Sequence, residues 1–254
     1  FEKATVKGTM FRGQKSIKMV THCQSSKRYD QYYILEMLAY QMYNLITDTS
    51  FRVRPLSITY RDDKNNETVA DRFAFLIEDD SDVADRHDLK KFVIPRVGPS
   101  RLEPVTTSRF ALFQYMIGNV DWAALSGPDP KECCHNVKLI APRPLEKGDP
   151  IYPVPYDFDS AGLVNAPYAA PPAGLPITNV TERMYRGYCV HNDTMQAARQ
   201  EYRDNKAAIL ALVNDHPGLS SSTKKKATRY LGKYFDVIES DKNFERKIIK
   251  KCRK

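Results

Sequence analysis

The chain has 254 residues, of which 42% are hydrophobic and 28% are charged, so it is long and apolar enough to bury a substantial core. This composition excludes a disordered chain, and the longest apolar run is shorter than the roughly 18 to 20 residues of a membrane-spanning helix. The formal net charge of +8 is concentrated in residues 221–254, which hold twelve Lys or Arg and four Asp or Glu. We interpret this basic segment as a solvated helix face, with a docking patch for an anionic partner as the alternative.

The N-terminal third of the chain predicts a strand, a long helix and two further strands. Residues 15–21 carry apolar side chains around Lys18, which indicates a strand with Lys18 on its polar side. Residues 26–47 place apolar side chains at helical intervals, with Ser and Asp near the start as caps. Residues 51–60 and 68–78 are rich in β-formers and joined by a polar turn, which predicts an antiparallel hairpin.

The middle of the chain predicts a buried helix and a second hairpin. The helix covers residues 104–118, with Thr106 or Thr107 as its cap and a glycine at its end. Two short apolar segments at 136–141 and 151–158 are separated by a turn that contains Pro and Gly, which is typical of a small hairpin. The first residues of the chain show no apolar stretch of the kind found in signal peptides.

The C-terminal third is predicted to be helical after one long loop. We expect the loop at 165–176 and helices at 192–214, 221–239 and 241–252. The fold class is therefore α+β, with a partial β-rich N-terminal part over residues 1–80 and a mostly helical C-terminal part over residues 81–254.

The five cysteines leave the disulfide pattern open. They are Cys23, Cys133, Cys134, Cys189 and Cys252, and no CxxC pair occurs, so we expect no structural zinc site. One or two disulfides fit this set, among them a bond from the adjacent pair to Cys23 or Cys189. The odd count leaves at least one thiol over.

Oxygen-bearing side chains stand at the ends of three predicted elements. Asp121 follows the buried helix, Asn136 opens a strand, and Asp157 and Asp159 close the next strand. The DxD spacing puts both carboxylates on one side of an extended chain. Phosphoryl transfer needs a carboxylate that orients the attacking hydroxyl and oxygen ligands that hold Mg²⁺ against nucleotide phosphates. These residues therefore indicate a metal- and phosphate-handling centre.

Such a centre also needs a lysine for the phosphates, positioned by a glutamate. Lys18 on the first strand and Glu36 on the long helix fit that pair, and the alternative is a surface lysine and a solvated glutamate. His135 is interpreted as a hydrogen-bonded structural residue, with a catalytic base or a ligand as the alternative. The absence of a GxSxG sequence disfavours a serine hydrolase.

The phrases NVDW, HN and YDFDSAG, in this order of elements, resemble the atypical kinases represented by the CotH spore-coat kinases. The resemblance implies a protein-kinase-like two-lobe fold that uses ATP with Mg²⁺ or Mn²⁺. It further implies that Asp121 is the catalytic aspartate and that Asn136, Asp157 and Asp159 bind metal. The segment FLIEDD, which contains Glu78, would lie at the hinge between the lobes and meet the adenine.

The same resemblance implies a nucleotide and a protein substrate as partners and a location outside the cytoplasm. We expect no membrane span and no nucleic-acid partner. The loop between Asp121 and Asn136 has fourteen residues, longer than in ordinary protein kinases, and no GxGxxG phosphate loop occurs. The alternative function is a catalytically inactive kinase-like module whose basic C-terminal surface docks a partner.

Overall fold

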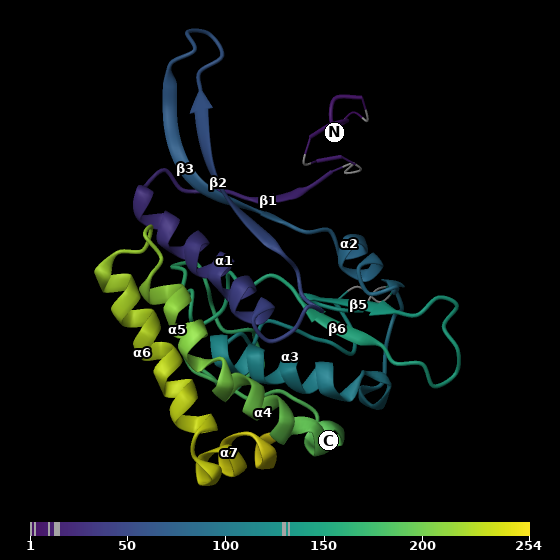
Figure 1. The fold of residues 1–254 in the computed structure, drawn as a ribbon. Helices are drawn as coiled ribbons and strands as arrows, with labels where there is room; N and C mark the ends of the chain where they lie inside the picture. Colours follow the sequence, from purple (N-terminus) through teal and green to yellow (C-terminus); the bar gives the residue numbers. More distant parts are fainter. Residues whose placement is uncertain (1, 3, 10, 13–15, 129–130, 132) are drawn as a thin grey trace.

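The computed structural model shows an α+β fold with a β-rich N-terminal part above a mostly helical part (Figure 1). It describes residues 2, 4–9, 11–12, 16–128, 131 and 133–254. These residues form seven α-helices and two three-stranded antiparallel sheets, which confirms the α+β class. Within the described ranges, none of the helices combines the length and the apolar character that crossing a membrane requires.

The N-terminal sheet has the strand order β1-β3-β2 and contains the predicted hairpin. Its strands are β1 (Lys18–Val20), β2 (Val53–Arg61) and β3 (Thr68–Ile77). β1 is shorter than the predicted strand at 15–21, whose first residue lies outside the described residues. β3 is exposed where it leaves the hairpin turn and buried from Ala74 to Ile77, where it reaches the body of the protein. The far end of the hairpin therefore projects away from the core (Figure 1).

The long predicted helix is present as α1 (Asp30–Asn44), preceded by a 3-10 turn at Lys27–Tyr29. The expected Ser or Asp cap is wrong, because the N-cap is Tyr29 and makes no side-chain cap. The 3-10 turn separates Ser26 from the helix, and Asp30 is already the first helical residue. Most of α1 is buried, which places its side chains between the N-terminal sheet and the helical part.

The second predicted helix is α3 (Pro104–Ile117), and its end at Gly118 is confirmed. Gly118 has φ +64°, a left-handed conformation that glycine adopts without steric cost. The expected cap at Thr106 or Thr107 is wrong, because the Glu103 carboxylate accepts from the backbone N–H groups of Val105 and Thr106. The start of α3 is set by Pro104, whose fixed φ and missing N–H suit the first helical position.

The second hairpin is confirmed as β5 (Val137–Ala141) and β6 (Tyr152–Pro155). A third strand, β4 (Lys90–Lys91), and the short helix α2 (Asp80–Asp85) were not predicted. The helix predicted at 192–214 is two helices that meet at Asn205. The C-terminal helices are α4 (Met195–Asp204), α5 (Lys206–Asn214), α6 (Ser221–Ile238) and α7 (Asp241–Lys247).

The larger hydrophobic cluster joins both parts of the chain across residue 80. Phe158, with 1% exposure, packs at 4.4 Å between ring centres on Tyr40 of α1 and at 5.1 Å on Phe113 of α3. Burial of one such aromatic side chain contributes roughly 1.5 to 3 kcal/mol. Phe158 stands between Asp157 and Asp159, so the core fixes the position of both carboxylates.

Two disulfides are formed, Cys133–Cys134 and Cys189–Cys252, and Cys23 is free and exposed. Two disulfides agree with the one or two that fit the sequence, whereas the open alternative of a bond from the adjacent pair to Cys23 or Cys189 is not formed among the described cysteines. Cys189 pairs with Cys252 because the C-terminal residues run beside it, with Cys189 N–H donating to Arg253 O at 2.9 Å. The disulfide thus ties the chain end to the segment before α4.

Candidate functional site

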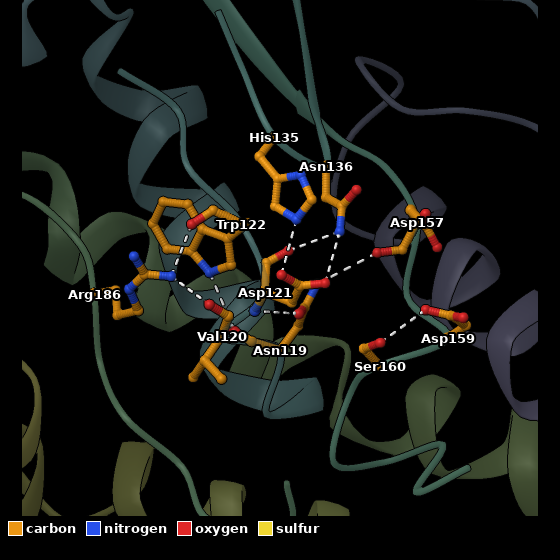
Figure 2. A network of polar contacts seen from close by, with 10 residues as sticks. All are labelled: Asn119, Val120, Asp121, Trp122, His135, Asn136, Asp157, Asp159, Ser160 and Arg186. Carbon is orange, nitrogen blue, oxygen red and sulfur yellow. Dashed lines mark hydrogen bonds and ion pairs between the residues drawn. The ribbon is translucent and has the colours of Figure 1, made fainter. Parts of the chain in front are cut away.

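The loop that carries Asp121 is held by buried and partly buried hydrogen bonds (Figure 2). Asn119, with 1% exposure, accepts from Asp121 N–H at 2.9 Å through its side chain and from Trp122 Nε1 at 3.1 Å through its carbonyl. Arg186 donates to the carbonyls of Val120 and Trp122. The backbone on both sides of Asp121 is therefore fixed, and this rigid loop presents the Asp121 carboxylate to the rest of the site.

His135 and Asn136 lie against the Asp121 carboxylate, although fourteen residues separate Asp121 from Asn136. Asp121 Oδ1 is 2.8 Å from His135 Nε2, and Asn136 Nδ2 donates to Asp121 O at 2.8 Å and to Oδ2 at 3.2 Å. An antiparallel bridge between Ala123 and His135 returns the chain to its starting point. Asp121 and Asn136 are therefore in contact, although the loop between them is long.

Asp157 and Asp159 follow β6 and lie beside this group, next to one another in Figure 2. Asp157 has φ +60°, and its N–H donates to the hydroxyl of Tyr40 at 2.9 Å. Its carbonyl accepts from Asn119 Nδ2 at 3.5 Å, so Asn119 joins the two acidic loops. The Asp159 carboxylate accepts from Ser160 Oγ at 3.0 Å. The structure therefore brings together Asp121 with Asn136 and Asp157 with Asp159.

The carboxylates at this site repel one another. Burial raises the pKa of Asp157 to about 6, and the charges of Asp159 and Asp121 add to the effect. Glu36 has 5% exposure, and burial raises its pKa well above the usual range, with further contributions from Asp157 and Asp159. Glu36 is thus a fourth carboxyl group close to the site. A bound cation would relieve the repulsion among these carboxyl groups, so the cluster favours the binding of a cation.

The donor atoms fit Mg²⁺ or Mn²⁺. These hard cations prefer carboxylate and amide oxygens, which Asp157, Asp159 and Asn136 supply. In the described part of the chain, no three His, Cys, Asp or Glu side chains are grouped as a ready-made metal site. Mg²⁺ does not need such a group, because it commonly binds one or two carboxylates together with waters and substrate phosphates. The residues present therefore fit a cation that arrives with a phosphate ligand.

Lys18 lies next to the site without touching Glu36. Its ammonium is 4.9 Å from the centre of the Tyr156 ring, and its charge contributes to the lowered pKa of Asp79, whose main cause is a hydrogen bond from Ser81. Lys18 and Glu36, both of which the structure describes, form no ion pair. The expected pair is not brought together, and Lys18 faces the edge of the site at Tyr156.

Glu78 lies in the wall of a cavity of about 310 Å³ beside the ends of β2 and β3. Its carboxylate accepts from Arg52 N–H at 2.9 Å and pairs with Arg86 at 3.0 Å, and its own N–H donates to Arg52 O. Burial raises the pKa of Glu78. The Glu78 side chain therefore holds the start of β2 and the segment after β3 together, and its carboxylate is taken up by Arg52 and Arg86.

Three residues of the site were not predicted. Lys138 of β5 lies 5.3 Å from the centre of the same Tyr156 ring as Lys18. Tyr40 accepts a hydrogen bond from Asp157 N–H, and the pKa of Tyr168 is raised by burial and by the nearby charge of Asp159. The sequence spacing from predicted site residues could have pointed to two of these three, Tyr40 and Lys138. Tyr40 follows Glu36 by one helical turn, and Lys138 lies two residues after Asn136, near the start of the predicted strand.

No protein-family model matches the chain, and a comparison with curated proteins gave no match either.

Proposed function

We propose that this protein is a kinase-like phosphotransferase that transfers phosphate from ATP to a hydroxyl group of a protein, with Mg²⁺ or Mn²⁺. The observation that carries the proposal is the convergence of Asp121, Asn136, Asp157 and Asp159 from three separate segment ends. Structural acids are usually spread over a surface, because like charges repel. Here they converge at a partly buried place, which is an arrangement that a phosphate-bound cation would stabilise.

In this proposal, the site residues have two roles, which are to activate the acceptor hydroxyl and to hold the cation. The Asp121 carboxylate, held by His135 and Asn136, would orient the acceptor hydroxyl and take up its proton. Asp157 and Asp159, with the amide oxygen of Asn136, would hold the cation. When bound, that cation neutralises the phosphate charges. Catalysis would come mainly from positioning, since all these groups stand on segments fixed by buried contacts.

The architecture supports the same proposal. Glu36 and Tyr40 come from α1, beside the N-terminal sheet, whereas Asp157 follows β6 in the later part of the chain. The site therefore lies where residues 1–80 meet residues 81–254. In the two-lobe scheme, a nucleotide would lie between these parts, with Lys18 on one side and the carboxylates on the other.

Calorimetric titration of the protein with ATP in the presence and absence of Mn²⁺ or Mg²⁺ tests the proposal. The informative variant is Asp157→Asn, since Asn tolerates a positive φ and removes only the charge. Asp63→Asn, in the exposed β2–β3 turn, is the matched control. We expect metal-dependent ATP binding that Asp157→Asn weakens by at least about tenfold and that Asp63→Asn leaves unchanged. A wild-type protein that binds no nucleotide would contradict the proposal and favour the inactive binding module.

A further inference from the structure

A groove of about 590 Å³ lies on the helical part, away from the residues of the acidic site. One wall is α6 with Lys233, and the other includes Lys247 at the end of α7 and Lys251 in the following 3-10 turn. α7 follows α6 directly and the two pack together at the lower end of the molecule (Figure 1). The groove therefore belongs to the segment in which the net positive charge of the protein is concentrated.

The three groove lysines are exposed and have no ion-pair partner among the described residues. Glu182 is the one acidic residue that lines the groove, and all the lining residues are described. Its Oε1 already accepts three hydrogen bonds from Thr178 and Asn179, which hold it at the rim. The groove thus presents ammonium groups that are available to an anionic partner.

The floor of the groove is apolar. Tyr115 and Tyr185 have 6% and 3% exposure, and Met184 and Val237 line the groove beside them. The guanidinium of Arg183 points into the protein, where it donates to the carbonyls of Tyr115, Met116 and Tyr230. A ligand of this groove would therefore need apolar groups for the floor as well as negative charges for the rim.

These features favour a peptide over a nucleic acid. Proteins that bind single strands present exposed aromatic faces on which bases stack. Tyr115 and Tyr185 are buried, so no such face is offered. An extended acidic peptide, in contrast, alternates side chains between two faces and can place apolar groups on the floor and carboxylates beside the lysines.

We propose that this groove binds an acidic peptide segment of a partner protein, with carboxylates paired to Lys233, Lys247 and Lys251 and apolar side chains on the floor. The proposal does not depend on phosphoryl transfer, because no groove residue belongs to the acidic site.

Fluorescence anisotropy with a labelled peptide of alternating Glu and Leu tests this proposal on the full chain. The groove variant is Lys233→Glu, Lys247→Glu and Lys251→Glu combined. The matched control reverses Lys225, Lys242 and Lys254, which are exposed on the same basic segment, do not line the groove, and change the net charge equally. Three surface ion pairs at about 0.2 to 1 kcal/mol each predict a loss of roughly threefold to a hundredfold in affinity for the groove variant. We expect the control to lose clearly less.

Two further probes sharpen the test. Replacing Leu by Ser in the peptide removes the apolar groups, and we expect this change alone to weaken binding to the wild type. Equal losses in the two triple variants would overturn the proposal, because net charge alone would then explain binding. Tighter binding of a single-stranded oligonucleotide than of the Glu-Leu peptide would also overturn it, as would a wild-type protein that binds no peptide. Circular dichroism confirms that both variants fold.

Discussion

The imidazole of His135 lies with Nε2 2.8 Å from Oδ1 of Asp121, and the backbones of His135 and Ala123 are paired around it. The sequence suggested a structural role for His135, with a catalytic one as the alternative. Its contact with the proposed catalytic carboxylate shows that this histidine orients Asp121. A hydrogen bond to an ionised group contributes roughly 1.5 to 3 kcal/mol. The bond can therefore hold one Asp121 rotamer, while Asn136 Nδ2 donates to the other carboxylate oxygen at 3.2 Å.

Replacing His135 by Ala should lower the turnover of ATP and leave ATP affinity nearly unchanged. We expect kcat, measured as ADP release, to fall by about tenfold to a hundredfold, because Asp121 loses its orientation. His135→Gln, which retains an N–H donor, should recover part of the loss. His87→Ala is the control, because that ring is hydrogen-bonded to the Asp48 carbonyl, outside the site. An equal loss of ATP affinity in His135→Ala would indicate a binding role instead.

Lys138 should contribute to phosphate binding together with Lys18. Both ammonium groups lie near the Tyr156 ring, that of Lys138 at 5.3 Å and that of Lys18 at 4.9 Å from the ring centre. We expect Lys138→Met to weaken binding of ATP with Mn²⁺ by about tenfold, the effect of one lost charge-assisted hydrogen bond. Adenosine, which has no phosphate, should bind Lys138→Met as it binds the wild type. Lys147→Met, in the exposed turn of the same hairpin, is the matched control.

The ATP and adenosine affinities of Lys138→Met distinguish phosphate binding by Lys138 from a structural role. If Asp157→Asn abolishes ATP binding while Lys138→Met has no effect, the phosphotransferase proposal stands and the role of Lys138 is wrong. If Lys138→Met weakens adenosine and ATP equally, the lysine supports the fold of the site and does not contact phosphate.

Asp79 should make the stability of the protein depend on pH in the acid range. Its carboxylate caps α2 and accepts from Ser81 N–H and Oγ, and these bonds lower its pKa to about 2. An unfolded Asp has a pKa near ~3.9, so the unfolded state takes up the proton first. The contribution of the cap is therefore complete above about pH 4 and is lost as the pH falls toward about 2.

Urea unfolding of wild type and Asp79→Ala over this pH range checks the expectation. At neutral pH the variant should be less stable by about 1 kcal/mol, the usual effect of removing a cap. The difference should shrink as the pH falls from about 4 to about 2. Asp63→Ala controls for the loss of an exposed carboxylate in the β2–β3 turn. A difference that stays constant down to about pH 2 would contradict this account.

Elements with strong local signals could be predicted from the sequence. The β2–β3 hairpin follows from its polar turn, and the end of α3 follows from Gly118. α2 was missed because six residues are too few to show a helical period, and its start is fixed by the local cap at Asp79. The cap of α3 could have been found, since Pro104 at the first helical position makes Glu103 the N-cap.

The site was predictable to a similar extent. Asp121, Asn136 and Asp157 were expected to converge because each stands at the end of an element, and segment ends are where polar side chains gather. Among the described residues, Lys18 and Glu36 form no ion pair, because a contact between side chains of two separate elements depends on their tertiary arrangement, which no local pattern contains. The same limit applies to Cys189, whose disulfide with Cys252 depends on the path of the chain end.

Replacing Gly162 by Ala should destabilise the protein, whereas the same change at Gly232 should not. A Cβ at Gly162 would come within 2.7 Å of the backbone oxygen of Val180 and would also meet the Tyr230 hydroxyl. The side chain of Tyr230 can move, but the backbone cannot do so without displacing the loop. Gly162 N–H also donates to Gly118 O at 3.1 Å, which ties the loop after Asp159 to the loop before Asp121. Gly162→Ala should therefore disturb both stability and the site.

We expect Gly162→Ala to cost about 1 to 3 kcal/mol in urea unfolding, the usual range for overpacking, and to weaken ATP binding with Mn²⁺. Gly232 stands inside α6, and a Cβ added there would meet no atom within 4 Å, so Gly232→Ala should stabilise the protein by about 0.5 to 1 kcal/mol. ATP binding should be unchanged in Gly232→Ala. A Gly162→Ala variant that is as stable as the wild type would show that the loop relaxes around the added methyl group, and the contact between the two acidic loops would then not be needed to hold the site.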